Sequence, residues 1–209
     1  MEHFFKVIKE KFGDQDPKVI LDVGARDLET SIQFTKRYPN SRIIAFEPNP
    51  FGFSVCQEKL KGYSNIELYN VACSDEEGVF DFWAVGGNDG CSSLLEPIDA
   101  PYSDGTWTKI QVNVSRLDKL LKDLNVDKVD VLWIDVQGVE LKSIRGMGSY
   151  LNSVDLIHTE ASPRPYYKGH ILKDELETFL DEQGFDMWFL PASHHPYGEG
   201  DLVCARKQK

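Results

Sequence analysis

Apolar runs and segments with helical spacing alternate along the first third of the chain. Three of the apolar runs predict buried strands, at residues 18–23, 41–48 and 65–72. Residues 31–39 and 51–62, which lie between these runs, predict helices, and residues 1–13 predict a short amphipathic helix whose apolar positions are interrupted by charges. Strands that alternate with helices are typical of a parallel sheet covered by helices.

The middle of the chain has a different pattern. Residues 78–85 and 110–115 alternate apolar and polar positions with a period of two, which predicts two half-buried strands. Residues 86–108 connect them and are rich in Gly, Ser and Asp, so we expect this connection to act as a lid. Ser115 and Asp118 predict a capping pair at the start of the helix that follows.

The last third of the chain returns to the pattern of the first. Two further apolar runs, each ending in an acid, predict buried strands with a turn and a helix between them. Residues 172–184 predict an amphipathic helix, and residues 185–191 and 201–207 predict a closing antiparallel hairpin. No repeat or linker divides the sequence, so we expect a single domain over residues 1–209.

Acidic residues end four of the predicted strands: Asp22, Glu47, Asp135 and Glu160. In an open parallel sheet, ligands bind beyond the carboxyl ends of the strands. A helix cap or a salt bridge would explain one acid at such a position, because a buried acid needs a partner. Four acids at equivalent positions predict a shared binding site instead.

The spacing of Gly24 and Glu47 indicates the ligand. Glu47 lies 23 residues after Gly24, close to the ~20-residue offset at which a carboxylate binds a ribose diol. A pyrophosphate would need several glycines in the first loop, where Leu28 stands instead. S-adenosylmethionine fits better, with Asp22 facing its ammonium or sulfonium and Arg26 its carboxylate. An NAD-type oxidoreductase with an unusual first loop is the alternative.

Five motifs occur in a fixed order between Val19 and Glu160: ILDVGA, AFEPNP, NVACSDEEG, CSSL and WIDVQGVELKSIRGM. In these motifs the chain resembles the FkbM family of S-adenosylmethionine-dependent methyltransferases. The resemblance implies an α/β, Rossmann-like class I methyltransferase fold. Its sheet would have seven mostly parallel strands in the order 3-2-1-4-5-7-6, with helices on both faces. The resemblance also implies methylation of a hydroxyl group, often on a sugar or a polyketide-like product.

The same resemblance implies where the cofactor binds. It places the methionine end at Asp22 and Gly24, the ribose at Glu47, the adenine near Pro48, Asn49 and Ala72, the methyl near Asp135, and Ser92 and Ser93 over the site. Two positions depart from the family pattern. Leu28 stands where a second glycine is usual, and Gln137 stands where the family has glutamate. A cofactor-binding module without turnover is therefore a further alternative.

Methyl transfer to a hydroxyl group needs a base, because the hydroxyl is a very weak acid. We expect Asp135 and Glu160 to accept the proton, or to hold Mg²⁺ or Mn²⁺ together. A helix cap for Asp135 and a structural salt bridge for Glu160 are the alternatives. His158 and His194 are further candidates for the base, with a core position and an exposed loop as their respective alternatives.

The composition excludes some partners. The net charge of −11 would repel a phosphate backbone, so we expect no nucleic acid, an RNA 2′-hydroxyl acceptor included. No apolar run is long enough to span a membrane, and the N-terminus does not resemble a signal peptide. With four cysteines and no C-x-x-C pair, we expect free thiols and a cytoplasmic protein. The expected partner is a small-molecule or glycan acceptor with a free hydroxyl, and the oligomeric state stays open.

Overall fold

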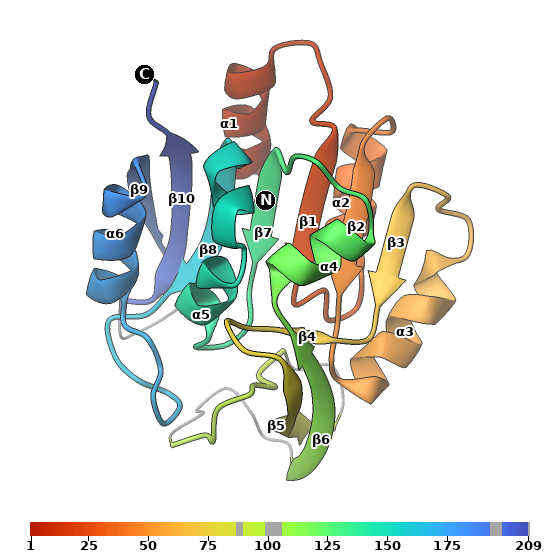
Figure 1. Ribbon diagram of the computed structural model, residues 1–209, viewed down its shortest axis with the longest axis vertical. Coiled ribbons are helices and arrows are strands. Elements are labelled where there is room, and N and C mark those ends of the chain that lie inside the picture. The colour runs from red at the N-terminus through yellow and green to blue at the C-terminus, as the bar shows by residue number, and fades with distance from the viewer. Residues whose placement is uncertain (87–89, 99–105, 193–197, 209) are drawn as a thin grey trace.

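A seven-stranded sheet forms the centre of the protein (Figure 1), whose computed structural model describes residues 1–86, 90–98, 106–192 and 198–208. Its strands lie in the order β3-β2-β1-β7-β8-β10-β9; β10 pairs antiparallel with β8 and β9, and the other pairs are parallel. Numbered within this sheet alone, the order is 3-2-1-4-5-7-6, which confirms the predicted fold. The strands are β1 (Val19–Val23), β2 (Arg42–Phe46), β3 (Ile66–Tyr69), β7 (Val131–Ile134), β8 (Leu156–Ala161), β9 (Phe185–Pro191) and β10 (Gly200–Arg206).

Helices cover both faces of this sheet. One face packs against α1 (Glu2–Phe12), α2 (Glu29–Arg37) and α3 (Pro50–Leu60). The other packs against α4 (Leu117–Asp123), α5 (Glu140–Arg145), the 3-10 helix η1 (Gly148–Ser153) and α6 (Lys173–Glu182). Because both faces are covered, successive residues of β1 are buried on opposite sides, Ile20 among the first group of helices and Leu21 among the second. This is why the strands appear in the sequence as continuous apolar runs.

A smaller sheet lies beyond the carboxyl ends of the large one (Figure 1). It has the order β4-β6-β5, with β4 (Ala72–Cys73) parallel and β5 (Gly78–Val85) antiparallel to β6 (Trp107–Ser115). The two strands predicted from period-two alternation are therefore confirmed, and they pair with each other. Their inward residues form a separate apolar cluster around Phe82 and Val112.

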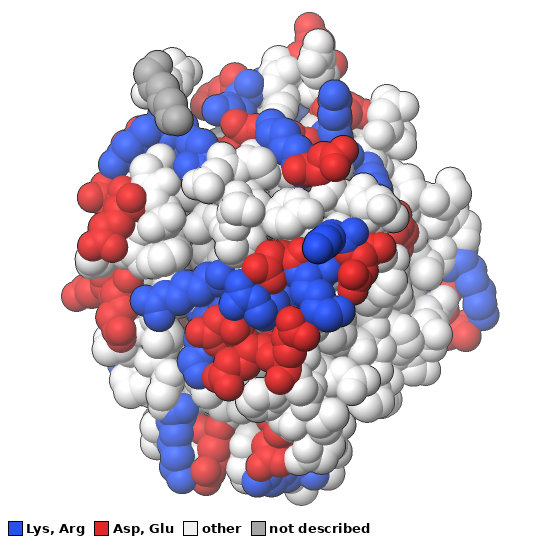
Figure 2. Space-filling model, viewed as in Figure 1, with Lys and Arg blue, Asp and Glu red and all other residues white. Residues whose placement is uncertain are grey.

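The predicted capping pair before α4 is wrong. The N-cap residue is Arg116, and no side chain caps the helix. Asp118 instead accepts hydrogen bonds from the Arg116 guanidinium at 2.6 and 3.0 Å. This face of the molecule carries a band of positive side chains bordered by acids (Figure 2), and ion pairs such as Lys119–Asp123 compensate its charge locally. Among the described residues, no helix combines the length and the apolar character that crossing a membrane requires.

Candidate functional site

A cavity of about 440 Å³ opens where the carboxyl ends of β1, β2 and β7 face the smaller sheet. Its volume is typical of small-molecule binding sites. Glu47, Asp135 and Glu160 lie on its wall, as does Arg26. Three of the four acids that end predicted strands are therefore brought together on one cavity, as the strand pattern predicts.

Gly24 allows the loops after β1 and β7 to approach each other. Its φ of +90° lies in the region that favours glycine. A Cβ atom at this position would lie 1.9 Å from the carbonyl oxygen of Asp135, which no side chain can tolerate. Gly24 itself lines the cavity, so its missing side chain also leaves room for a ligand beside Asp135.

Leu28 does not fill the cavity, although a leucine is unusual at this point of the loop. It adopts a φ of +67°, a conformation that costs a non-glycine residue roughly 1–2 kcal/mol. Its side chain is fully buried in the apolar cluster with Ile32 and Phe34, on the side of the sheet covered by α1 and α2. The missing second glycine therefore changes the backbone strain of the loop and leaves the cavity open.

Glu47 presents its carboxylate to the cavity from the end of β2. The backbone N–H of Arg26 donates to Oε2 at 2.7 Å, and the backbone N–H of Asn49 donates to Oε1 at 2.8 Å. Burial raises the pKa of Glu47 to about 7, while these two hydrogen bonds favour the ionised form. Each oxygen keeps a further lone pair, so the ionised group can accept two more hydrogen bonds from a diol.

Asn49, Pro48 and Ala72 also line the cavity, and their contact with the adenine stays a prediction. Asn49 is the N-cap of α3, where its Oδ1 accepts from the backbone N–H of Phe51 at 3.0 Å. Its Nδ2 donates to the Ser92 hydroxyl at 3.1 Å and so connects α3 to the segment 90–98. The predicted adenine side of the site is thus formed by three parts of the chain: the start of α3, β4 and segment 90–98.

The two serines of the CSSL motif have different positions. Ser92 lines the cavity, whereas Ser93 is buried behind it and donates to the backbone carbonyl of Gln137 at 2.7 Å. The placement of Ser93 over the ligand is therefore corrected: it attaches segment 90–98 to the loop after β7. Residues 87–89 and 99–105 of the predicted lid lie outside the described residues.

Asp22 lies behind the cavity wall. Its Oδ2 accepts from the Ser31 hydroxyl at 2.6 Å, and its Oδ1 has no hydrogen-bond partner among the described residues. Burial raises the pKa of Asp22 to about 7. A buried oxygen without a partner is consistent with a water or ligand group next to it, so a role for Asp22 toward the methionine end stays a prediction.

Asp135 and Glu160 are joined by the side chain of Gln137. Its amide nitrogen donates to Asp135 Oδ1 at 2.7 Å and to Glu160 Oε2 at 2.8 Å. Loss of hydration raises the pKa of both carboxyls, and that of Glu160 is raised further by the charges of Asp135 and Glu140. Neither acid has an ion pair with a lysine or arginine within the described part of the chain.

Glu140 completes a group of three acids whose oxygens lie within 4.8 Å of one another. Its own carboxylate accepts the backbone N–H groups of Val136 and Gly138, so it closes the turn before α5. A cation held by Asp135 and Glu160 stays a prediction, and it would have to displace the Gln137 amide that now joins them.

His158 lies in the core, so its prediction as the base is wrong. It stacks on Trp133 at 3.5 Å between ring centroids, and Phe4 of α1 packs edge-on against it. Alternate residues of a strand share a face, but β7 ends at Ile134 and pairs with β8 no further than Thr159. Glu160 lies beyond that last pair and lines the cavity, whereas the His158 ring is covered by the side chains of Trp133 of β7 and Phe4 of α1. The other candidate base, His194, lies outside the described residues.

The sequence analysis predicted Ala72 and Ser92 on this side of the site, but it did not single out three other residues of the smaller sheet and segment 90–98. Phe82, Leu94 and Cys91 line the cavity from there. Tyr167 comes from a loop whose aromatic residues suit carbohydrate recognition, with a plain surface loop as the alternative; its hydroxyl lies 2.7 Å from the Cys91 carbonyl oxygen and 3.1 Å from Gln137 Oε1. The alternation of apolar and polar residues in β5 indicated that one face is buried, but it did not indicate that this face lies over the cavity.

Comparison with known proteins identifies the family of this chain. The Methyltransferase FkbM domain matches residues 22–187. The chain is 31% identical over 166 residues to 2-O-methyltransferase NoeI of Sinorhizobium fredii (strain NBRC 101917 / NGR234), covering 75% of this chain and 68% of the relative. It is 24% identical over 218 residues to Methyltransferase sdnD of Sordaria araneosa, covering 90% and 81%.

Solved structures show the same fold at low sequence identity. The Precorrin-6y C5,15-methyltransferase of Geobacter metallireducens GS-15 matches with a TM-score of 0.55 at 18% identity, covering 99% of this chain and 88% of that one. The magnesium protoporphyrin IX methyltransferase (ChlM) of Synechocystis PCC 6803, solved with bound SAM, matches with a TM-score of 0.56 at 12% identity, covering 99% and 77%. The chain belongs to the FkbM family of S-adenosylmethionine-dependent methyltransferases.

Proposed function

We propose that the protein transfers a methyl group from S-adenosylmethionine to a hydroxyl group of a sugar or glycan precursor. The observation that carries this proposal is that one cavity contains two kinds of acid. Glu47 is held by backbone amides and keeps lone pairs for a diol. Asp135 and Glu160 form a joined acid pair that also lines the cavity. The first suits the ribose of the cofactor and the second suits a hydroxyl acceptor.

The residues present fit this cofactor. Glu47 would accept hydrogen bonds from both ribose hydroxyls, and Arg26 would face the carboxylate of the methionine part. Gly24 has no side chain, so the cofactor could lie close to the backbone there. Bound S-adenosylmethionine supplies an electrophilic methyl group on its sulfonium. The NAD-type oxidoreductase is not retained, because the chain belongs to a methyltransferase family.

In the proposed reaction the acceptor hydroxyl donates its hydrogen bond to Asp135 or Glu160. As the hydroxyl oxygen forms its bond to the methyl carbon, the carbon–sulfur bond breaks and its electron pair stays on sulfur. The proton passes to the carboxylate, and the products are a methyl ether and S-adenosylhomocysteine. A carboxyl group with a raised pKa is a stronger base than an ordinary one, which supports this role for the pair.

Oxygen as the methylated atom is supported by the name of the similar 2-O-methyltransferase NoeI. The charge of the cavity supports an acceptor that donates hydrogen bonds and carries no phosphate. Among the described residues on its wall, Arg26 is the single cation, against Glu47, Asp135 and Glu160. Two carboxylates beside the acceptor would repel a phosphate group and accept hydrogen bonds from neutral polyols.

Two measurements test the proposal. Isothermal titration should show binding of S-adenosylhomocysteine and none of NAD. Labelled methyl transfer should then be measured onto free monosaccharides and oligosaccharides, each matched with its phosphorylated form, and we expect neutral acceptors to be methylated in preference. Binding of NAD alone would overturn the proposal. Binding of S-adenosylhomocysteine without transfer to any hydroxylated acceptor would favour the non-catalytic module instead.

A further inference from the structure

Gln137 occupies a central position between the two acids of the proposed acceptor site. Both hydrogens of its amide nitrogen are used, one by Asp135 at 2.7 Å and one by Glu160 at 2.8 Å. These acids belong to different strand ends, after β7 and in β8. An amide donor bonded to both of them therefore sets the distance between the two carboxylates and the direction in which each points.

The backbone of Gln137 adopts an unusual conformation that accompanies this contact. Its φ is +55°, in the left-handed region that side chains other than glycine rarely adopt, and Gly138 follows with a φ of +99°. Strained residues of this kind are concentrated at functional sites. A glycine would suit this backbone conformation better, but it would have no side-chain amide. The strained backbone is therefore accompanied by the two hydrogen bonds that the Gln137 side chain donates.

Contacts on the other side of Gln137 hold the amide in one orientation. Its Oε1 lies 3.1 Å from the Tyr167 hydroxyl, and its backbone carbonyl accepts from the Ser93 hydroxyl at 2.7 Å. If the amide turned over, its oxygen would face the oxygens of Asp135 and Glu160, which is unfavourable while these groups are ionised. The segment that covers the cavity is thus connected to the acid pair through this one residue.

We propose that Gln137 is a positioning residue that takes the place of a bridging cation between Asp135 and Glu160, so that the acid pair acts on the acceptor without a divalent metal. The proposal rests on the proposed function of this site. Two ionised carboxylates this close repel each other, and a cation or a hydrogen-bond donor between them stabilises both. A divalent cation is one solution, and an amide that donates to both is another. The amide nitrogen lies where a cation would have to be.

Two substitutions at this position separate these roles. Gln137→Leu keeps the approximate volume and removes both donors, so the acids lose their common partner. Gln137→Glu keeps the shape and adds a third carboxylate, which together with Asp135 and Glu160 gives the oxygen ligands that Mn²⁺ prefers. Gln57→Glu, an exposed position on α3, is the matched control for the added charge.

We expect the wild-type protein to bind no Mn²⁺ by isothermal titration and to keep its methyl-transfer rate in EDTA. Gln137→Leu should lower kcat by about 10- to 100-fold, as misplaced catalytic groups do, with the KM for S-adenosylmethionine within about threefold of wild type. Gln137→Glu should bind Mn²⁺, be inactive in EDTA and recover activity with Mn²⁺. Gln57→Glu should behave as the wild type.

Three results would overturn this inference. They are a wild-type rate that depends on a divalent cation, a folded Gln137→Leu protein with an unchanged kcat, and a folded Gln137→Glu protein that binds no Mn²⁺. Circular dichroism and thermal unfolding show whether each variant is folded. The Mn²⁺ titrations need no acceptor, so they test Gln137 even if no methyl transfer is found, a result that would count against the proposed function alone.

Discussion

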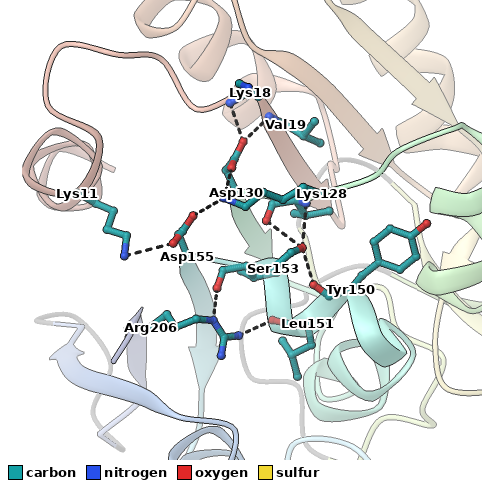
Figure 3. Close-up of polar contacts among 12 residues, drawn as sticks. Lys11, Lys18, Val19, Lys128, Asp130, Tyr150, Leu151, Ser153, Asp155 and Arg206 are labelled. Carbon is teal, nitrogen blue, oxygen red and sulfur yellow. Dashed lines mark hydrogen bonds and ion pairs between the residues drawn. The ribbon is translucent and has the colours of Figure 1, made fainter. Parts of the chain in front are cut away.

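Acidic residues at the two ends of the central sheet differ in their partners. At the amino end, the Asp130 carboxylate accepts the backbone N–H groups of Lys18 and Val19 at 2.7 and 2.9 Å and pairs with Lys128 (Figure 3). Asp155 pairs there with both Lys128 and Lys11. At the carboxyl end, Glu47, Asp135 and Glu160 form no ion pair with the side chain of a described lysine or arginine.

The pKa shifts differ accordingly. Burial acts to raise the pKa of Asp155, but hydrogen bonds from Lys128 and Lys11 outweigh it and hold that pKa below its usual value. Burial without cations raises the pKa of Glu47 to about 7 and also raises that of Glu160. The amino end therefore uses its charges to join strands, whereas the carboxyl end keeps charges that cost stability and are available for a ligand.

Neutralising the acid pair should show the largest effect. We expect Asp135→Asn or Glu160→Gln to lower kcat by about 10²- to 10⁴-fold, because a positioned base contributes that much. The melting temperature of Glu160→Gln should stay equal or rise, since burial and the neighbouring acids disfavour the charged form of Glu160 and raise its pKa. Methyl-transfer assays and thermal unfolding check this prediction. A large loss of stability together with full activity would show that these acids are structural.

Removing an acid from the amino end should lower the stability of the protein and leave its activity unchanged. Asp130→Ala leaves the backbone N–H groups of Lys18 and Val19 without their acceptor, which should lower the free energy of unfolding by about 2–4 kcal/mol. Urea unfolding measures this loss, and kcat per folded molecule should not change. Lys128→Met is the control, because its half-exposed ion pairs should contribute less than about 1 kcal/mol.

The affinity for S-adenosylhomocysteine should depend on pH through Glu47. Only the ionised carboxylate can accept both ribose hydroxyls, and its pKa in the free protein is about 7. Affinity should therefore be constant above this pH and fall, by up to about tenfold per pH unit, as the pH is lowered below it. Isothermal titration at pH 5.5 and pH 8 measures the difference.

Glu47→Gln is the matched variant for this pH dependence. It should bind about 10- to 100-fold more weakly at pH 8, because it replaces hydrogen bonds to a charged group by neutral ones. It should also lose the Glu47 share of the pH dependence. An equally steep decrease in the variant would assign the dependence to another group, such as Asp22, whose pKa is also about 7.

The smallest effect is expected at Leu28. Gly suits its φ of +67° better, but Leu28→Gly also empties a fully buried position. The relief of strain and the cavity partly cancel, so we expect a net loss of about 1–2 kcal/mol in the free energy of unfolding. The affinity for S-adenosylhomocysteine should not change, because this side chain lies in the core. A clear change in affinity would contradict the position of Leu28 outside the site.

Much of the site could be predicted from local patterns. Gly24, Glu47, Asp135 and Glu160 follow apolar runs that are strands, and parallel strands end on the same side of a sheet. The prediction for His158 used the same periodicity and was wrong. Periodicity indicates which face a residue is on, but it does not show how far the neighbouring strand extends, and β7 covers this histidine.

The sequence by itself determined the class of fold, the order of its elements and the acids at the strand ends, because hydrophobic period and side-chain chemistry are local properties of a chain. Tertiary structure alone decided that Leu28 enters the core and that the smaller sheet closes the cavity. It also decided that Gln137 joins Asp135 to Glu160. These features are contacts between segments distant in sequence, and their geometry depends on how the whole sheet packs.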